Sequence, residues 1–109
     1  MRAIHIDSEM RTVSEVDLDD KDVLSSMQEQ VGGFIELVHW FPNKDDVYVD
    51  EEGRLKGKRT GFILKGSPHH YYVGNGLVVG RDGDESCDAK STVLDVGKLV
   101  TFIGVRDEE

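Results

Sequence analysis

Hydrophobic and polar positions alternate along the first part of the chain. Residues 2–6 place Ile4 and Ile6 on one face, and residues 12–18 alternate in the same way. A period of two residues is typical of a strand with one buried face. The polar residues between the two segments favour a turn. The pattern therefore predicts a β-hairpin at the start of the chain.

The period changes from two residues to a helical one after residue 19. Between residues 20 and 31 the apolar positions are Val23, Leu24, Met27 and Val31. This spacing places them on one stripe of a helix of about three turns. Asp19 or Asp20 is expected to cap its start, and one residue of the glycine pair that follows is expected to adopt the left-handed conformation that ends it.

The most apolar segment of the chain covers residues 34–41 and is predicted to be the central strand of the sheet, because aromatic and β-branched residues dominate it. Residues 46–49 predict the next strand. The DEEG segment is expected to be a hairpin loop with Gly53 in the left-handed conformation, and RLKG is expected to begin the return strand.

The last half of the chain has a weaker pattern, with short strands expected at residues 62–64, 74–80 and 98–105 and one helical turn at residues 91–97. The total is about six strands and one main helix. This predicts an α+β protein, with one antiparallel-dominated sheet and the helix packed on it. The 109 residues are expected to form a single domain (1–109), with its core in about residues 2–105 and a short acidic tail at 106–109.

Composition suggests a protein of the cytoplasm. The chain has no apolar run of about 18 residues and no apolar signal core at its start, so neither a membrane span nor export is expected. Its single cysteine has no partner for an internal disulfide, which fits a reducing compartment. Neither a cofactor nor a metal is expected, because the sequence contains no spacing typical of a metal site, a phosphate loop or a nucleophile–base pair.

Charge is distributed unevenly along the chain. The formal net charge is −9, which makes direct nucleic-acid binding unfavourable. Residues 1–53 carry a net charge of −10, whereas residues 54–81 carry six basic residues and no acidic one. The basic stretch is either a solvated loop paired with acidic neighbours or a pocket for an anion such as a nucleotide. The candidate ligand-binding residues of such a pocket are Lys58, Arg59, Lys65, His69 and Tyr71.

Three consecutive carboxylates, Asp50, Glu51 and Glu52, raise the question of a metal or catalytic site. Consecutive residues of a strand point to alternate faces, so three in a row do not converge on one point. The sequence therefore predicts that they form the solvated tip of a hairpin, and no catalytic residue is assigned.

Three segments, MQEQVGGFIELV, DVYVDEEGRLKG and GNGLVVGRD, occur in an order and spacing that resemble a family found mainly in bacteriophages, plasmids and their hosts, domain of unknown function 3846. The resemblance covers about residues 2–105. It departs after the EEG turn, where similar proteins often carry an N-R-A segment and this chain has KGKRTGFILKG. The resemblance implies a viral or mobile-element origin and a small accessory protein, and it implies no catalytic residues. We expect such a protein in the cytosol of the host cell.

These observations favour a non-enzymatic protein that acts by binding. The most specific hypothesis is an acidic inhibitor of a host defence or nucleic-acid-handling protein, in which exposed carboxylates imitate nucleic-acid phosphates. The residues expected to form this acidic surface are Asp19, Asp20, Asp45, Asp46, Asp50, Glu51 and Glu52. The alternatives are a protein that binds or sequesters a small nucleotide-type anion, and a structural or regulatory phage protein. An exposed GLVVG edge strand would also allow a homodimer.

Overall fold

A computed structural model describes residues 1–105 of the chain, except for the side chain of Trp40; the expected acidic tail, 106–109, lies outside the described residues. The strands are β1 (Arg2–Asp7), β2 (Thr12–Asp17), β3 (Ile35–Trp40), β4 (Asp45–Asp50), β5 (Thr60–Leu64), β6 (Tyr72–Val73), β7 (Gly76–Asp82), β8 (Glu85–Cys87) and β9 (Val100–Gly104). The helices are α1 (Val23–Val31), α2 (Val93–Leu99) and the 3-10 helix η1 (Gly53–Lys56). Within residues 1–105, no helix has the length and apolar character that crossing a membrane requires.

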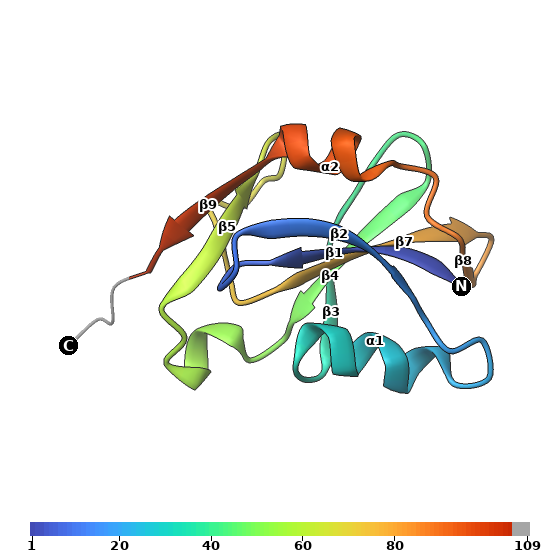
Figure 1. Ribbon diagram of the computed structural model, residues 1–109, viewed down its shortest axis with the longest axis horizontal. Coiled ribbons are helices and arrows are strands. Elements are labelled where there is room, and N and C mark those ends of the chain that lie inside the picture. Colours follow the sequence, from blue (N-terminus) through green and yellow to red (C-terminus); the bar gives the residue numbers. More distant parts are fainter. Residues whose placement is uncertain (106–109) are drawn as a thin grey trace.

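Two antiparallel sheets form the frame (Figure 1). The larger sheet has six strands in the order β2-β1-β7-β4-β3, with β8 also paired to β7. The smaller sheet has the order β6-β5-β9. The predicted α+β class, the six-stranded antiparallel sheet and the hairpin of β1 and β2 are confirmed. The small second sheet was not predicted, and α2 is a helix of seven residues where the sequence predicted one helical turn.

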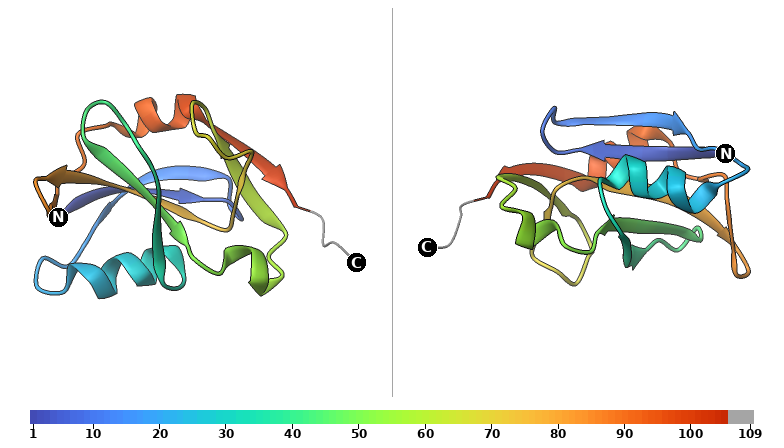
Figure 2. Two further views of the ribbon diagram at one scale, coloured as in Figure 1. Left: turned by 180° about the vertical axis from the view of Figure 1, so that it is seen from behind. Right: turned by 90° about the horizontal axis from the view of Figure 1, so that it is seen from below.

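The larger sheet is covered on both faces, which explains the near-continuous apolar run in β7. Leu77 and Val79 join the cluster under α1, whereas Val78 joins the cluster that faces the smaller sheet and α2. Figures 1 and 2 show α1 on one side of this sheet and α2 on the other. Gly76 lies where the two sheets approach closely, since a Cβ atom there would be 2.7 Å from the Phe62 ring.

Helix α1 begins and ends as its sequence chemistry favours. Asp22 caps the N-terminus by accepting a hydrogen bond from the backbone N–H of Ser25 at 3.2 Å. The cap is therefore Asp22 and not Asp19 or Asp20. Gly32 ends the helix in the left-handed conformation, with φ of 93°, as predicted. Met27 and Val31 are the buried residues of its apolar stripe.

The predicted places of two strands in the sheet are wrong. β3 lies at an edge and not in the centre, and Phe34 and Leu37 are accordingly exposed. β7, which contains the GLVVG segment, lies in the centre between β1 and β4. GLVVG therefore offers no free edge for a homodimer. An apolar strand can occupy either position, and only the pairing partners distinguish them.

The predicted return strand after the acidic turn is also wrong, because the RLKG segment forms the end of the 3-10 helix η1 and its C-cap, Gly57. Gly53 is not left-handed; the residue with positive φ here is Gly57, at 67°. Gly53 serves close packing instead, since a Cβ atom on it would lie 2.5 Å from the carbonyl oxygen of Val73. At the second helix, Thr92 is the N-cap of α2 and forms a capping box with Asp95.

Candidate functional site

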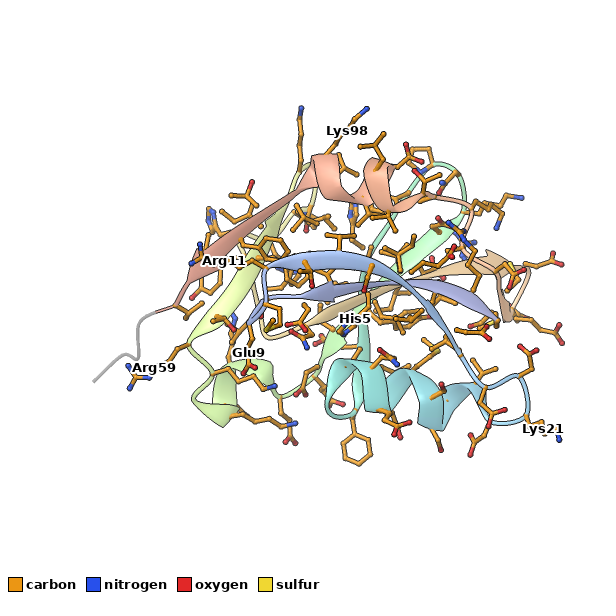
Figure 3. The ribbon with its side chains drawn as sticks, in the orientation of Figure 1. His5, Glu9, Arg11, Lys21, Arg59 and Lys98 are labelled. Atoms are coloured by element: carbon orange, nitrogen blue, oxygen red, sulfur yellow. The ribbon has the colours of Figure 1, made fainter. Side chains whose placement is uncertain are left out.

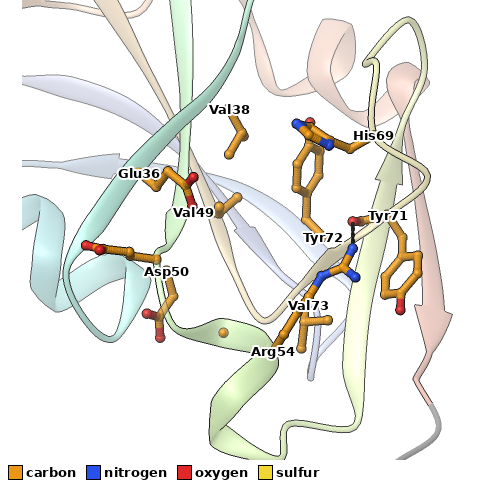
Figure 4. Close-up of a pocket in the computed structure, with 11 residues that line it drawn as sticks. Glu36, Val38, Val49, Asp50, Arg54, His69, Tyr71, Tyr72 and Val73 are labelled. Carbon is orange, nitrogen blue, oxygen red and sulfur yellow. Dashed lines mark hydrogen bonds between the residues drawn. The ribbon is translucent and has the colours of Figure 1, made fainter. Parts of the chain in front are cut away.

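A pocket of about 380 Å³ lies where the edge of the larger sheet meets the end of the smaller one. Strands β3 and β4 supply one wall, and η1, β6 and the segment before β6 supply the other (Figure 4). Its lining residues are Glu36, Val38, Val49, Asp50, Glu51, Gly53, Arg54, His69, Tyr71, Tyr72 and Val73. A volume of this size is at the lower end of the range of small-ligand sites.

The alternation of the strands determines which side chains reach this pocket. On β3, Glu36 and Val38 face the pocket, whereas Ile35, the residue before Glu36, packs in the cluster under α1. Val38 and Val49 provide apolar surface from the larger sheet. In Figure 4, Glu36 enters from the β3 side and His69 and Arg54 come from the opposite wall. The pocket thus combines an apolar base with charged and aromatic sides.

The wall opposite β3 is organised around two tyrosines. The Arg54 guanidinium lies over the Tyr71 ring, 4.4 Å from its centroid, and donates a hydrogen bond to the Tyr71 carbonyl oxygen at 3.1 Å. Tyr72 shares a hydroxyl–hydroxyl hydrogen bond with Ser67, and the His69 ring packs edge-on to it at 5.7 Å between centroids. A cation on the face of Tyr71 is an electrostatically favourable arrangement.

The potential around Tyr72 is influenced by a carboxylate on the other wall. Burial raises the pKa of Tyr72 above its usual value of 10.0, the hydrogen bond with Ser67 opposes this rise, and the negative charge of Glu36 adds to it. The negative charge of Glu36 therefore affects the Tyr72 hydroxyl across the pocket. Glu51, a second exposed carboxylate, lines the same pocket.

An ion pair between Asp50 and Lys56 holds the lower end of the pocket. The Asp50 carboxylate is fully buried, lies 2.7 Å from Lys56 Nζ and accepts the backbone N–H of Glu52 at 2.9 Å. Lys56 Nζ also donates to the carbonyl oxygen of Gly32 at 3.1 Å, which ties η1 to the end of α1. Gly33 leaves room for the pair, because a Cβ atom there would be 2.5 Å from Lys56 Nζ and 2.8 Å from Asp50 Oδ1.

The acidic triplet is thus only in part the predicted solvated tip. Glu51 and Glu52 are exposed, whereas Asp50 is buried and paired. Asp50 is the last residue of β4, whereas Glu51 and Glu52 belong to the turn that follows the strand. A buried carboxylate at this position could not be distinguished from an exposed one by its sequence neighbours.

Two other residues of the expected acidic surface are also buried. Asp45 accepts hydrogen bonds from the backbone N–H groups of Lys90 and Ser91, the latter at 2.7 Å. Asp46 is paired with Arg81, with Nε and Oδ1 3.2 Å apart. Together with Asp50 these side chains support the fold and cannot belong to an exposed surface. Asp19, Asp20, Glu51 and Glu52 are exposed, as that prediction requires.

The residues of the predicted anion pocket do not all come together. His69 and Tyr71 line the pocket, but Lys58, Arg59 and Lys65 are not among its lining residues. Arg59 and Lys65 flank the two ends of β5, a separation of roughly 20 Å at the usual rise per strand residue. Lys58 extends over Gly74 towards Gly32. Figure 3 likewise shows Lys21, Arg59 and Lys98 on separate parts of the surface.

Sequence reasoning missed the two charged residues that define the pocket, Glu36 and Arg54. Glu36 lies in an apolar strand, where a single carboxylate indicates a solvent-facing position and no more. Arg54 lies in the segment predicted to begin the return strand, and its contact with Tyr71 spans 17 residues of sequence. The one available signal was the Arg and Tyr content of the basic stretch.

The fold and this pocket define a class: a small antiparallel α+β domain of two sheets with an open pocket between them. The chain belongs to the family described as domain of unknown function DUF3846, whose model matches residues 1–100. The predicted resemblance is thereby confirmed. Searches among curated proteins and among solved structures found no match.

The segments that carry this family resemblance meet at one place in the structure. The glycine pair after α1 lies against Lys56 and Asp50, and the GNG segment at the start of β7 lies against Lys58, just after η1. Lys58 approaches a Cβ position on Gly74 to 3.4 Å, and Lys56 reaches Gly32. These segments therefore build the frame below the pocket and also supply Glu36 and Arg54 to it, while Tyr71 and Tyr72 come from outside them.

Proposed function

We propose that this protein is a non-enzymatic binding protein and that its pocket accepts a cationic side chain of a basic partner. The observation that carries the proposal is the placement of Glu36 and Glu51 at the pocket, with Arg54 already held on the Tyr71 ring. A guanidinium or ammonium group entering the pocket gains two carboxylate neighbours and aromatic surface. The apolar base of Val38 and Val49 suits the methylene stem of such a side chain.

The overall charge supports a basic partner as well. A net charge of −9 attracts cationic surfaces over distances beyond direct contact and raises the association rate. The exposed carboxylates Asp19, Asp20, Glu51 and Glu52 contribute to this field. We therefore propose an accessory protein of phage or mobile-element type that inhibits a nucleic-acid-handling or defence protein of the host cytosol by occupying its basic surface.

The pocket is tested directly by titrating isotope-labelled protein with N-acetyl-arginine amide, which carries only a guanidinium charge. We expect chemical-shift changes in β3 and around Tyr71, a loss of binding in Glu36→Gln, and weaker binding as salt is raised. Glu29→Gln, on the exposed face of α1, is the matched control and should bind normally. N-acetyl-norleucine amide controls for the apolar stem.

Two outcomes would refute the proposal. One is the absence of arginine-dependent shifts at low salt. The other is equal binding by the wild type and Glu36→Gln, which would place the cation elsewhere. Adenosine monophosphate serves as the opposite probe, and preferential binding of this anion would favour the nucleotide alternative.

A further inference from the structure

The edge of β3 beside the pocket has no strand partner among the described residues, since β3 pairs with β4 alone. The backbone N–H of Glu51 donates to the carbonyl oxygen of Phe34 at 2.8 Å. In an antiparallel pair, successive residues direct their backbone N–H and C=O groups alternately towards and away from the partner strand. Glu36, two residues after Phe34, therefore also directs its backbone groups towards β4. Ile35 and Leu37 consequently direct theirs outward, which leaves a short row of donors and acceptors at the edge.

Common protections of a free edge are missing from this part of β3. The strand contains neither lysine nor proline, and its bulge comes only after Leu37. Leu37 is 48% exposed and Phe34, just before the strand, is 65% exposed. The stretch from Phe34 to Leu37 is thus a regular, partly apolar edge.

We propose that the cationic group reaches the pocket on an extended, basic segment of a partner protein that pairs with this edge of β3. The inference rests on the function proposed above and specifies how the partner docks. Strand addition to a sheet edge supplies affinity through main-chain hydrogen bonds and specificity through alternate side chains. The two faces of β3 at this edge then dictate the pattern of the segment.

Each face of β3 requires a different residue type from the added strand. On the pocket face, a residue opposite Glu36 has its Cβ atom about 5 Å from that of Glu36, within reach of an ion pair for lysine or arginine. On the α1 face, a residue opposite Leu37 meets half-exposed apolar surface. The expected recognition pattern alternates basic and apolar residues.

A second copy of this chain fits the edge poorly. Residues 34–41 contain no lysine or arginine, so β3 of a copy would bring no strong cation to the pocket. It would bring a second Glu36 and a further net charge of −9 instead. Charge complementarity therefore favours a basic partner segment over self-association.

The test uses the full-length protein and a peptide of about eight residues that alternates valine and lysine. Two further peptides carry backbone N-methyl groups, one on its valines and one on its lysines. Residues of an added strand point their N–H groups alternately towards and away from β3. We therefore expect one N-methylated peptide to lose at least about tenfold in affinity and the other to retain it, because only one set faces the edge. A valine–glutamate peptide should not bind.

Glu36→Gln should weaken the valine–lysine peptide about tenfold, whereas Glu29→Gln should leave its affinity unchanged. Equal affinity of both N-methylated peptides for the wild type would overturn strand addition. If binding of N-acetyl-arginine amide still required Glu36 in that case, the proposed function would stand and only strand addition would be rejected. Failure of both the peptides and the blocked arginine would refute both proposals. Concentration-dependent dimerisation that Leu37→Lys abolishes would assign the edge to a second copy.

Discussion

Removal of the Lys56 ammonium should be among the most damaging changes near the pocket. Lys56→Met keeps most of the side chain but leaves the Asp50 carboxylate with the backbone N–H of Glu52 as its remaining described donor. The side chain of Asp50 has no exposed surface, whereas that of Lys56 is 34% exposed. The two partners are therefore not equivalent, because only the lysine has access to water.

The size of the effect follows from this asymmetry. Breaking a fully buried ion pair by removing one partner costs about 3–5 kcal/mol, and partial access of water to Lys56 reduces this to about 2 kcal/mol for Lys56→Met. Asp50→Asn should cost only about 1 kcal/mol, because the amide oxygen still accepts the Glu52 N–H and the lysine can turn to solvent. The double variant should be more stable than the sum of the two changes implies, with a coupling of about 1 kcal/mol.

Urea unfolding of the wild type, both single variants and the double variant gives the four free energies of this double-mutant cycle. The corresponding fall in melting temperature for Lys56→Met is about 10 °C for a domain of this size. Glu15→Gln, which removes the exposed partner of Arg2, is the control and should cost less than about 1 kcal/mol. A larger loss for Asp50→Asn than for Lys56→Met, or a coupling near zero, would refute the reasoning.

Three further changes test other parts of the frame. Gly33→Ala should destabilise the protein by about 1–3 kcal/mol, because the added Cβ atom collides with the buried ion pair. Gly97→Ala, whose Cβ atom would meet nothing within 4 Å, should stabilise α2 by about 0.5–1 kcal/mol. Urea unfolding of both variants measures these two changes in the free energy of unfolding. Asp45→Asn should accelerate amide hydrogen exchange after β8, since one acceptor oxygen replaces two; unchanged exchange would contradict this. The Met1 ammonium donates hydrogen bonds to Asp20 and Asp17, which raise its pKa from 8.0 to about 10. Its contribution to stability should therefore be complete below pH 8 and disappear as the pH rises through 10; melting curves should show this slope weakened in Asp20→Asn.

The sequence predicted the helices and strands themselves better than it predicted which strands pair in the sheet. The hairpin of β1 and β2, helix α1 and the presence of strand β4 follow from local patterns. The order of strands does not, because a strand with apolar residues on both faces, such as β7, and an edge strand such as β3 have similar composition. Long-range pairing is set by how the two faces of the sheet are covered, and local periodicity does not contain this information.

The charged residues show the same division. Asp45, Asp46 and Asp50 are acidic in sequence and buried in structure, each with a specific partner contributed by another segment. Burial of a carboxylate depends on such partners, which a charge count cannot supply. The charge count therefore overestimated the acidic surface and wrongly placed Lys58, Arg59 and Lys65 in one pocket. It did identify residues 54–81 as the basic part of an acidic chain.

The pocket side chain of Glu36 should affect binding without affecting stability, in contrast to the frame beneath it. Glu36 is exposed and faces the pocket, whereas its neighbour Ile35 packs under α1. Substitution of an exposed residue outside a packed or paired site usually changes stability by less than about 0.5 kcal/mol. Glu36→Lys should consequently unfold in urea like the wild type, lose blocked arginine, and gain affinity for adenosine monophosphate beside Arg54. A loss of stability above about 1 kcal/mol would show that Glu36 belongs to the frame, and binding data on its variants would then report on folding and not on recognition.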